Sequence, residues 1–150
     1  MAWRSIDELL RAEVERLLTV GGAAGAVGSM VTQLAREAGA YVIGTGRGAD
    51  RQAVIDFGAK EFVDLENDVL EDVDRVDLVF DVIGGDIGKR SAGLIRAGGI
   101  LVSIVGPTEA RPAGGLAIDF VVESDRAQLS EIVQRVREED RTRGLSLCRR

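Results

Sequence analysis

Short apolar runs alternate with amphipathic stretches along most of the chain. The first run, residues 17–20 (Leu-Leu-Thr-Val), stops at a glycine cluster, which is typical of a buried strand. The next stretch repeats apolar residues at the spacing of one helix face, from Val27 to Ala38, and Gly39 stands where a helix commonly ends. Residues 41–45 form a second apolar run. The pattern predicts a strand, a helix and a second strand in succession.

The same alternation continues along the rest of the chain. Asp50 is placed to cap a helix that runs to Gly58, and a helix over residues 87–95 is closed by Gly98-Gly99. Asp125 begins the last helix, whose apolar face consists of Leu129, Ile132, Val133 and Val136. The remaining predicted elements are a short amphipathic helix at residues 5–14 and strands at residues 61–65, 77–83, 100–105 and 119–123.

Apolar strands that alternate with helices indicate a parallel sheet covered on both faces. We therefore predict an α/β fold of the Rossmann type, a doubly wound parallel six-stranded sheet with helices on both faces. No repeat or long linker divides the chain, so we expect a single domain over residues 1–150 with its core at about 16–137.

The glycine-rich turn between the first strand and the first long helix is the main candidate for ligand binding. Its pattern is Ala23-x-Gly25-x-x-Gly28, the dinucleotide motif G-x-G-x-x-G with Ala in place of the first glycine. Gly25 lets the backbone approach a pyrophosphate, Gly28 lets the helix pack tightly, and the free N–H groups of the helix start face the anion. The alternative is that a chain with 19 glycines has this spacing by chance or only for packing.

The end of the second strand bears on which dinucleotide would bind. NAD sites place an acid there, about 20 residues after the glycine motif, to accept hydrogen bonds from the ribose. Gly46 occupies that place, with Thr45 and Arg47 beside it and Arg51 one helical turn further. Cations at this point suit a 2′-phosphate, so the sequence favours NADP(H) over NAD(H). Two alternatives stay open: the arginines form a solvated face, or Asp50 reaches the ribose and favours NAD.

Composition narrows the chemistry further. The sequence contains no His, and its single Cys is Cys148. A Ser-His-Asp triad, a catalytic zinc or other metal site of His or paired Cys, and an internal disulfide are therefore excluded. The net charge of −6 disfavours nucleic acid as a partner. No apolar run reaches the roughly 18 residues of a membrane span, so we expect a cytoplasmic protein.

Four stretches resemble the cofactor-binding domain of the medium-chain dehydrogenase/reductase superfamily, in particular its zinc-independent NADPH:quinone oxidoreductases. They are residues 22–28 (GAAGAVG), 41–45 (YVIGT), 76–85 (VDLVFDVIGG) and 97–103 (AGGILVS), in the family's order and spacing. The resemblance implies a nicotinamide dinucleotide as cofactor and hydride transfer from NADPH to a quinone or an activated alkene. It also implies that two copies pair along the last strand, so we expect a homodimer through residues 119–123, unless the loop at 111–116 covers that edge.

The resemblance further implies three groups of cofactor contacts. The first group would bind the pyrophosphate and consists of Ala24, Gly25, Ala26 and Val27, with Gly28 behind them. The second group would bind the adenosine end and consists of Thr45, Gly46, Arg47 and Arg51. The third group would bind the ribose and nicotinamide end and consists of Ile83, Gly84, Val105 and Gly106. The glycines of this last group have ordinary loop chemistry as an alternative explanation.

Three features depart from the family pattern. Ala26 stands where this branch usually has a second adjacent glycine, and Gly21 sits where a His is common. We also expect the chain to lack the substrate-binding, GroES-like barrel that normally precedes this domain in the family. Two alternatives to an oxidoreductase domain therefore stay open: a dinucleotide-binding or sensing module without turnover, and a truncated gene product.

Overall fold

A six-stranded parallel sheet forms the centre of the structure, a computed structural model that describes residues 14–105, 112, 114–119 and 126–143. The strand order is β3-β2-β1-β4-β5-β6, which confirms the predicted doubly wound α/β fold. The strands are β1 (Arg16–Val20), β2 (Tyr41–Gly46), β3 (Glu61–Asp64), β4 (Val76–Asp81), β5 (Ile95–Ser103) and β6 (Leu116–Asp119). The helices are α2 (Ala26–Glu37), α3 (Arg51–Phe57), α4 (Gly85–Ala92) and α5 (Arg126–Arg143), with 3-10 turns η1 (Gly48–Asp50) and η2 (Leu70–Asp72).

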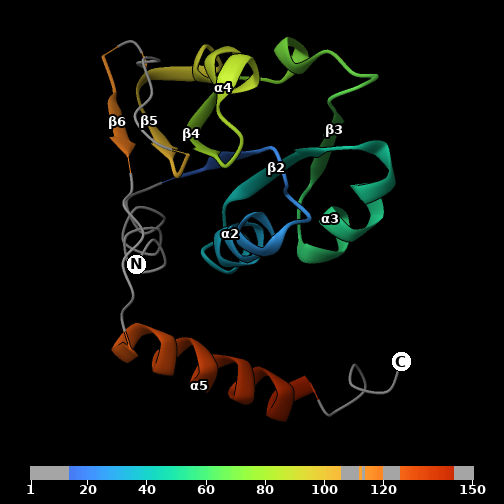
Figure 1. The fold of residues 1–150 in the computed structure, drawn as a ribbon, viewed down its shortest axis with the longest axis vertical. Helices are drawn as coiled ribbons and strands as arrows, with labels where there is room; N and C mark the ends of the chain where they lie inside the picture. The colour runs from blue at the N-terminus through green and yellow to red at the C-terminus, as the bar shows by residue number, and fades with distance from the viewer. Residues whose placement is uncertain (1–13, 106–111, 113, 120–125, 144–150) are drawn as a thin grey trace.

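Helices cover both faces of the sheet (Figure 1), and an apolar core lies on each face. Successive strand residues point to opposite faces, so Leu17 packs in the core beneath α2 and α3, whereas Leu18 packs in the core beneath α4 and η2. Both leucines are fully buried, and each such burial contributes roughly 1.5–3 kcal/mol. Burial on both faces explains why the central strands are almost continuously apolar.

The predicted helix at 87–95 is wrong at its C-terminal end. The helix α4 ends at Ala92, and β5 begins at Ile95, which pairs with Val76. The register then shifts, and pairing resumes between Ile100 and Leu78. Gly98 has φ +79, and a Cβ on Gly99 would lie 2.8 Å from the Asp77 carbonyl oxygen. The two glycines therefore form an irregularity inside a strand and do not close a helix.

The last strand also lies elsewhere than predicted. β6 is Leu116–Asp119, so it shares only Asp119 with the expected run, and residues 120–123 lie outside the described part of the chain. A Cβ on Gly115 would collide with the Gly99 carbonyl oxygen, so this glycine lets the chain pass close to β5 just before the strand begins. The predicted helix at 5–14 falls almost wholly on residues that the structure does not describe.

The helix α5 begins one residue after the predicted start. The side chains of its apolar face are largely exposed, with Leu129 at 55% and Val136 at 51% of their accessible area. Figure 1 shows α5 (orange-red) apart from the sheet. A contact to α2 is the pair between Arg135 Nη2 and Glu37 Oε2, 3.0 Å apart. An apolar helix face predicted from spacing is thus formed, but it is not packed on the sheet.

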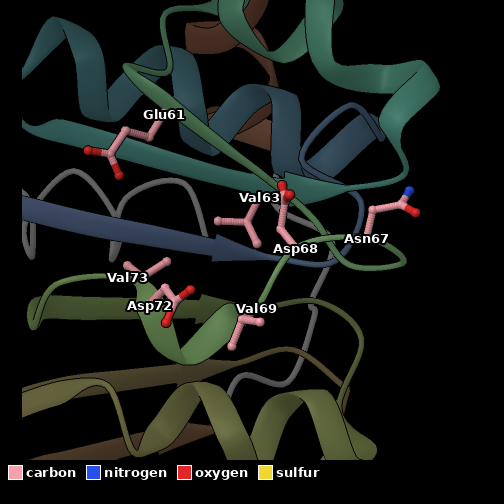
Figure 2. A pocket seen from close by; sticks show the side chains of 7 residues that line it. All are labelled: Glu61, Val63, Asn67, Asp68, Val69, Asp72 and Val73. Carbon is pink, nitrogen blue, oxygen red and sulfur yellow. The ribbon is translucent and has the colours of Figure 1, made fainter.

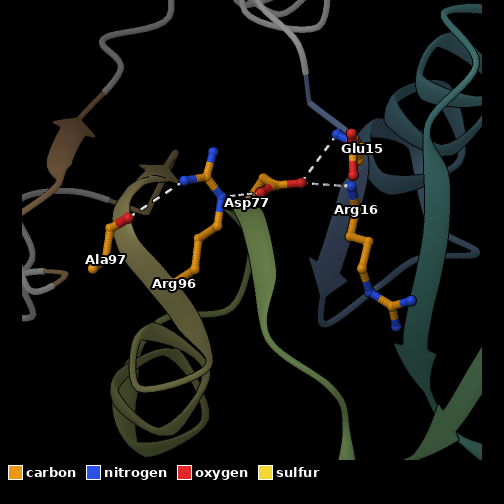
Figure 3. Close-up of polar contacts among 5 residues, drawn as sticks. All are labelled: Glu15, Arg16, Asp77, Arg96 and Ala97. Carbon is orange, nitrogen blue, oxygen red and sulfur yellow. Dashed lines mark hydrogen bonds and ion pairs between the residues drawn. The ribbon is translucent and has the colours of Figure 1, made fainter.

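A partly buried carboxylate joins three segments at the amino ends of the central strands. Asp77 Oδ2 accepts hydrogen bonds from the N–H groups of Glu15 and Arg16 at 3.0 and 2.9 Å, and Oδ1 pairs with Arg96 Nε (Figure 3). Burial raises the pKa of Asp77, but the Arg16 N–H, the Arg96 guanidinium and the Glu15 N–H together hold it below its usual value. The carboxylate thereby joins β1, β4 and the irregular start of β5.

Candidate functional site

The predicted ligand-binding segments meet at the carboxyl ends of the strands. The chain runs from β1 outward to β2 and β3, and then returns to the other side of β1 to form β4, β5 and β6. Open α/β sheets bind ligands at the carboxyl ends of the strands where the order reverses in this way, here between β1 and β4. The turns after β1, β2, β4 and β5 all end at this edge, and we call it the candidate site.

The turn after β1 is shaped for an anion. Gly25 N–H donates to the Gly22 carbonyl at 2.8 Å, and a Cβ on Gly28 would collide with that same carbonyl oxygen. The helix α2 starts without a side-chain cap and without an acid in its first turn, so its first N–H groups face outward. Gly25, Ala26 and Val27 are exposed there. The residues present therefore fit a bound phosphate group.

The Ala in place of the first motif glycine has a packing reason. Ala23 is fully buried, and its methyl would lie 3.3 Å from a Cβ placed on Gly44 in the neighbouring strand β2. Such a Cβ would also collide with Val54 of α3. The space between β2 and α3 therefore holds the Ala23 methyl group, and Gly44 adds no side chain there.

The Thr45 side chain has a structural role beside the glycine turn. Its side chain is fully buried, and its Oγ1 accepts a hydrogen bond from Gly21 N–H at 2.8 Å and donates one to the Thr19 carbonyl at 3.0 Å. The hydroxyl thereby joins β2 to the end of β1 beneath the glycine turn.

The turn after β2 gathers the predicted adenosine residues. The Arg47 side chain is 77% exposed, and its Nε lies 3.6 Å from Asp50 Oδ2. Arg51 lies over the Phe62 ring, 5.0 Å from its centroid, and its Nη2 is 3.6 Å from Asp68 Oδ2. Each arginine at this end of the site therefore has a carboxylate close by.

The predicted capping role of Asp50 is wrong. Asp50 occupies the position before α3, but it makes no side-chain cap hydrogen bond, and its backbone is helical instead of extended (φ −89, ψ −8). The 3-10 turn η1 ends at Asp50 and continues into the helix, so the extended backbone that an N-cap needs does not form.

Asp64 holds the turn after β2 in place, and the sequence analysis did not identify this residue. This buried carboxylate accepts hydrogen bonds from the Asn67 side-chain amide at 2.8 Å and from the Glu66 N–H at 3.0 Å, and also from the Gly48 N–H. The Asn67 amide, and next the Glu66 N–H, hold the pKa of Asp64 below its usual value although burial raises it. A Cβ on Gly48 would lie 2.6 Å from Asp64 Oδ2. The sequence Asp-Leu-Glu-Asn-Asp at residues 64–68, at a strand end, is an Asx-turn signal that could have revealed it.

The turn after β4 forms the other end of the site. Asp81, also missed by the sequence analysis, is buried, and its Oδ1 accepts hydrogen bonds from the N–H groups of Ile83 and Gly84 at 2.9 and 2.8 Å. This directs the Ile83 side chain outward, where it is 51% exposed. Val105 is equally exposed, and its Cγ2 would lie 3.0 Å from a Cβ on Gly84. Gly106 lies outside the described residues.

Gly21 lies in a turn that has no space for a side chain. Its φ is +69, and a Cβ would lie 2.6 Å from Ile83 Cβ. The first glycine after β1 is thus in contact with the turn after β4, which brings the two sides of the strand reversal together.

A hollow of about 430 Å³ lies beside β3, and its lining residues come from β3 and the segment that follows it (Figure 2). Three carboxylates line it, and one of them, Asp68, is the partner of Arg51. The concentration of negative charge disfavours a phosphate ligand there. Its lining residues are Glu61, Val63, Asn67, Asp68, Val69, Asp72 and Val73.

The donor set for a metal ion is poor. In the described ranges no three His, Cys, Asp or Glu side chains gather in an arrangement that could hold a metal ion. The sequence adds no His and a single Cys, so the residues do not fit a zinc site. Among the helices of the described part, none has both the length and the apolar character to cross a membrane.

The doubly wound sheet, with the glycine turn at its point of strand reversal, defines an α/β domain of the Rossmann type. A family model described as zinc-binding dehydrogenase matches residues 26–139. The chain belongs to this family of oxidoreductases, within the medium-chain dehydrogenase/reductase superfamily, which confirms the predicted resemblance.

Individual relatives agree with this assignment. The probable zinc-binding oxidoreductase, mitochondrial, of Arthroderma benhamiae is 33% identical over an aligned length of 132 residues, and the match covers 79% of this chain and 40% of that protein. The quinone oxidoreductase from Coxiella burnetii has a TM-score of 0.73 and 25% identity, covering 89% of this chain and 46% of that one. Escherichia coli quinone oxidoreductase complexed with NADPH has a TM-score of 0.69 and 23% identity, covering 88% and 48%. The chain spans less than half the length of each of these relatives.

Proposed function

We propose that this chain is the NADP(H)-binding domain of a quinone oxidoreductase-like enzyme whose reaction transfers a hydride from NADPH to a quinone or an activated alkene. The observation that supports this most is the pairing of two features at one edge of the sheet. The start of α2 leaves its N–H groups open to an anion, and Arg47 stands exposed where an acid would mark an NAD site.

The phosphates would be held at two points. The backbone of Ala24, Gly25, Ala26 and Val27 would bind the pyrophosphate, and Gly28 allows the close approach of α2 behind them. Arg47 would bind the 2′-phosphate next to Gly46, where no side chain is in the way. The guanidinium of Arg51 already contacts Phe62 and Asp68, so Arg51 would contribute only to the positive potential around the phosphate.

The nicotinamide end would be held by apolar side chains and backbone. Ile83 and Val105 present exposed apolar surface around Gly84, and Gly106 would extend this surface. Bound NADPH supplies the hydride, while these residues would orient the ring and exclude water from one of its faces. Asp81 has no free role in proton transfer here, because its Oδ1 holds two backbone N–H groups.

A binding titration tests this function. We expect NADPH to bind more tightly than NADH by about ten-fold to a hundred-fold, the size of one charge-assisted contact to phosphate. Isothermal calorimetry of the purified chain with each dinucleotide gives both dissociation constants. Equal affinities would remove the assignment to NADP(H), and no binding of either would remove the cofactor-domain assignment.

Turnover separates an oxidoreductase domain from a module that binds without reaction. The nicotinamide end offers Ile83, Gly84 and Val105, and its buried acid Asp81 is engaged by two backbone N–H groups, which supports the binding module as the second candidate. We expect the chain alone to oxidise NADPH with simple quinones slowly, because it fixes only one of the two reactants, and positioning both supplies about 7–11 kcal/mol. Saturable NADPH oxidation that Gly25→Asp abolishes would show that the chain forms its own acceptor site.

The exposed edge of the sheet suggests a homodimer. β6 pairs with β5 on one side, and Leu116 at its start is largely exposed. We propose that two copies associate along this edge, through β6 and the following residues to 123. Light scattering at micromolar concentration should give the mass of a dimer, and Leu116→Glu should shift it toward the monomer. A monomeric mass of the unmodified protein would contradict this proposal.

A further inference from the structure

One side of α5 carries an apolar stripe that the rest of the described chain leaves uncovered. Leu129, Val133 and Val136 follow one another at the spacing of a single helix face, so they form one continuous surface. Their exposed fractions are 55%, 41% and 51%. Single exposed apolar side chains are common, but a contiguous apolar surface rimmed by charged residues is typical of an interaction site.

The ion pair between α5 and α2 turns this stripe outward. Arg135 Nη2 lies 3.0 Å from Oε2 of Glu37, the last residue of α2. At 3.6 residues per turn, position 135 is roughly 160° away from Val133 around the helix axis. The side of α5 that contacts α2 is therefore not the apolar side, and the stripe is open to a second molecule.

The stripe ends in charges of opposite sign. Arg126 precedes Val133 by seven residues and Asp140 follows it by seven, so helical spacing places both on the same stripe. In an antiparallel pair of α5 helices with Val133 opposite Val133, Arg126 of each helix would lie beside Asp140 of the other. Leu129 of each helix would then lie near Val136 of the other. The stripe is thus complementary to itself about a two-fold axis.

The β6 edge leaves room for such a contact within one dimer. β6 has four residues, about 13 Å of strand, whereas specific interfaces bury about 1,200–2,000 Å² in total. α5 has 18 residues and is about 27 Å long, so it offers the larger surface. Six residues separate β6 from α5, which places the start of α5 within about 25 Å of the end of β6. One two-fold axis can therefore pass beside both elements.

We propose that the apolar stripe of α5 is a self-association surface that packs antiparallel against α5 of a second copy of this chain. Val133 lies at the two-fold axis, and pairs of Arg126 with Asp140 close the contact at both ends. The inference shares with the proposed function the expectation of two copies, but it assigns their contact to a different element and does not depend on dinucleotide binding.

The central test is Val133→Glu, with the monomer–dimer dissociation constant of the whole chain measured by sedimentation equilibrium. The substitution places two carboxylates against each other at the axis, so we expect the dissociation constant to rise by at least about a hundred-fold. Gln134→Glu adds the same charge on another side of the helix and should change the constant by about two-fold or less. Far-ultraviolet circular dichroism of both variants checks that α5 still forms.

Exchange of the end charges tests the antiparallel orientation. Arg126→Asp and Asp140→Arg should each raise the dissociation constant by about two-fold to five-fold, because each places like charges side by side. The variant that carries both changes should return to the original constant. A sum of the two losses in the double variant would contradict the antiparallel pair.

A cysteine at the axis tests the contact even if Val133→Glu does not fold. In a Cys148→Ser background, Val133→Cys should form a disulfide-linked dimer with oxidised glutathione, because the two Cβ atoms face each other at the axis. Gln134→Cys should not cross-link under the same conditions. Equal cross-linking of the two variants would overturn the proposal.

The outcomes separate the α5 contact from the β6 edge. If Val133→Glu dissociates the dimer and Leu116→Glu does not, the α5 contact stands and the edge contact falls. If the unmodified chain is a monomer, or is a dimer that Leu116→Glu dissociates and Val133→Glu leaves intact, the inference is overturned. Calorimetry with NADPH tests the dinucleotide function independently of either result.

Discussion

The two halves of the sheet present different kinds of residue at the candidate site. The half formed by β1, β2, β3 and α3, the adenosine half, presents two guanidinium groups, each beside a carboxylate. The half formed by β4, β5 and α4, the nicotinamide half, presents exposed Ile83 and Val105, and its carboxylate Asp81 is buried under two backbone N–H groups.

This contrast indicates how the two halves would divide the recognition of a cofactor. NADH and NADPH differ by one phosphate at the adenosine end and are identical at the nicotinamide end. Charged side chains respond to that phosphate, whereas apolar side chains contribute equally to both ligands. We therefore expect substitutions in the adenosine half to separate the two affinities and substitutions in the nicotinamide half to change them together.

The largest effect is expected at the glycine turn that both halves share. Gly25→Asp places a carboxylate at the anion site, and the Cβ of the new side chain would lie 3.1 Å from the Gly22 carbonyl oxygen. We expect the affinities for both dinucleotides to fall by at least about a hundred-fold in calorimetry. Ala38→Asp, at the exposed opposite end of α2, adds the same charge and should leave binding intact. Unchanged binding by Gly25→Asp would show that the phosphates lie elsewhere.

A smaller effect, on one cofactor, is expected at Arg47. Arg47→Ala should weaken NADPH by about ten-fold to a hundred-fold and leave NADH within about two-fold, because only the 2′-phosphate loses a partner. Fluorescence titration with both dinucleotides measures the difference. An equal loss of affinity for NADPH and NADH would contradict the expected difference between the two halves.

A still smaller effect, on both cofactors alike, is expected at Ile83. Ile83→Ala removes exposed apolar surface at the nicotinamide end, which we expect to cost about 1 kcal/mol, or about five-fold in each affinity. Val69→Ala, an equally exposed apolar residue beside the acidic hollow, serves as the matched control. A change in the NADPH-to-NADH ratio at Ile83→Ala would contradict the division proposed here.

The smallest effect concerns the free energy of unfolding at acid pH and does not involve cofactor binding. Arg90 of α4 makes two hydrogen bonds to Glu71, at 2.5 and 2.7 Å, which lower the pKa of Glu71 from 4.5 to about 2. The folded state therefore binds this proton less readily than the unfolded state. The contribution of the pair is present above pH 4.5 and is lost as the pH falls from 4.5 toward 2. In urea unfolding, Glu71→Gln should be less stable than the unmodified protein at pH 7 and approach its stability near pH 2.

Local patterns predicted the elements that carry the fold. The helix face from Val27 to Ala38 and the apolar runs of the central strands come from short-range periodicity, and the structure contains all of them. Gly39 and Gly58 end their helices with φ of +85 and +116, as their positions indicated. Gly98 and Gly99 have the same composition but another role, because it is pairing with β4, distant in sequence, that turns them into a strand irregularity.

The candidate site was predicted less completely, for a similar reason. The position of the glycine turn and that of Arg47 can each be predicted from a single segment of the sequence. The roles of Thr45, Asp50 and Asp64 depend on which segments lie beside them, namely Gly21, Arg47 and Gly48. A carboxylate or hydroxyl near a strand end has several possible partners, and the sequence does not rank them.

The carboxylate of Asp77 has a consequence for the exchange of amide hydrogens with solvent. The first residues of a strand commonly fray, and their N–H groups then exchange quickly. Here the N–H groups of Glu15 and Arg16, at the start of β1, both donate to Asp77 Oδ2 on the neighbouring strand. Opening this end of β1 requires breaking two charge-assisted bonds at once, so the amide protons of Glu15 and Arg16 should exchange as slowly as those of the strand interior.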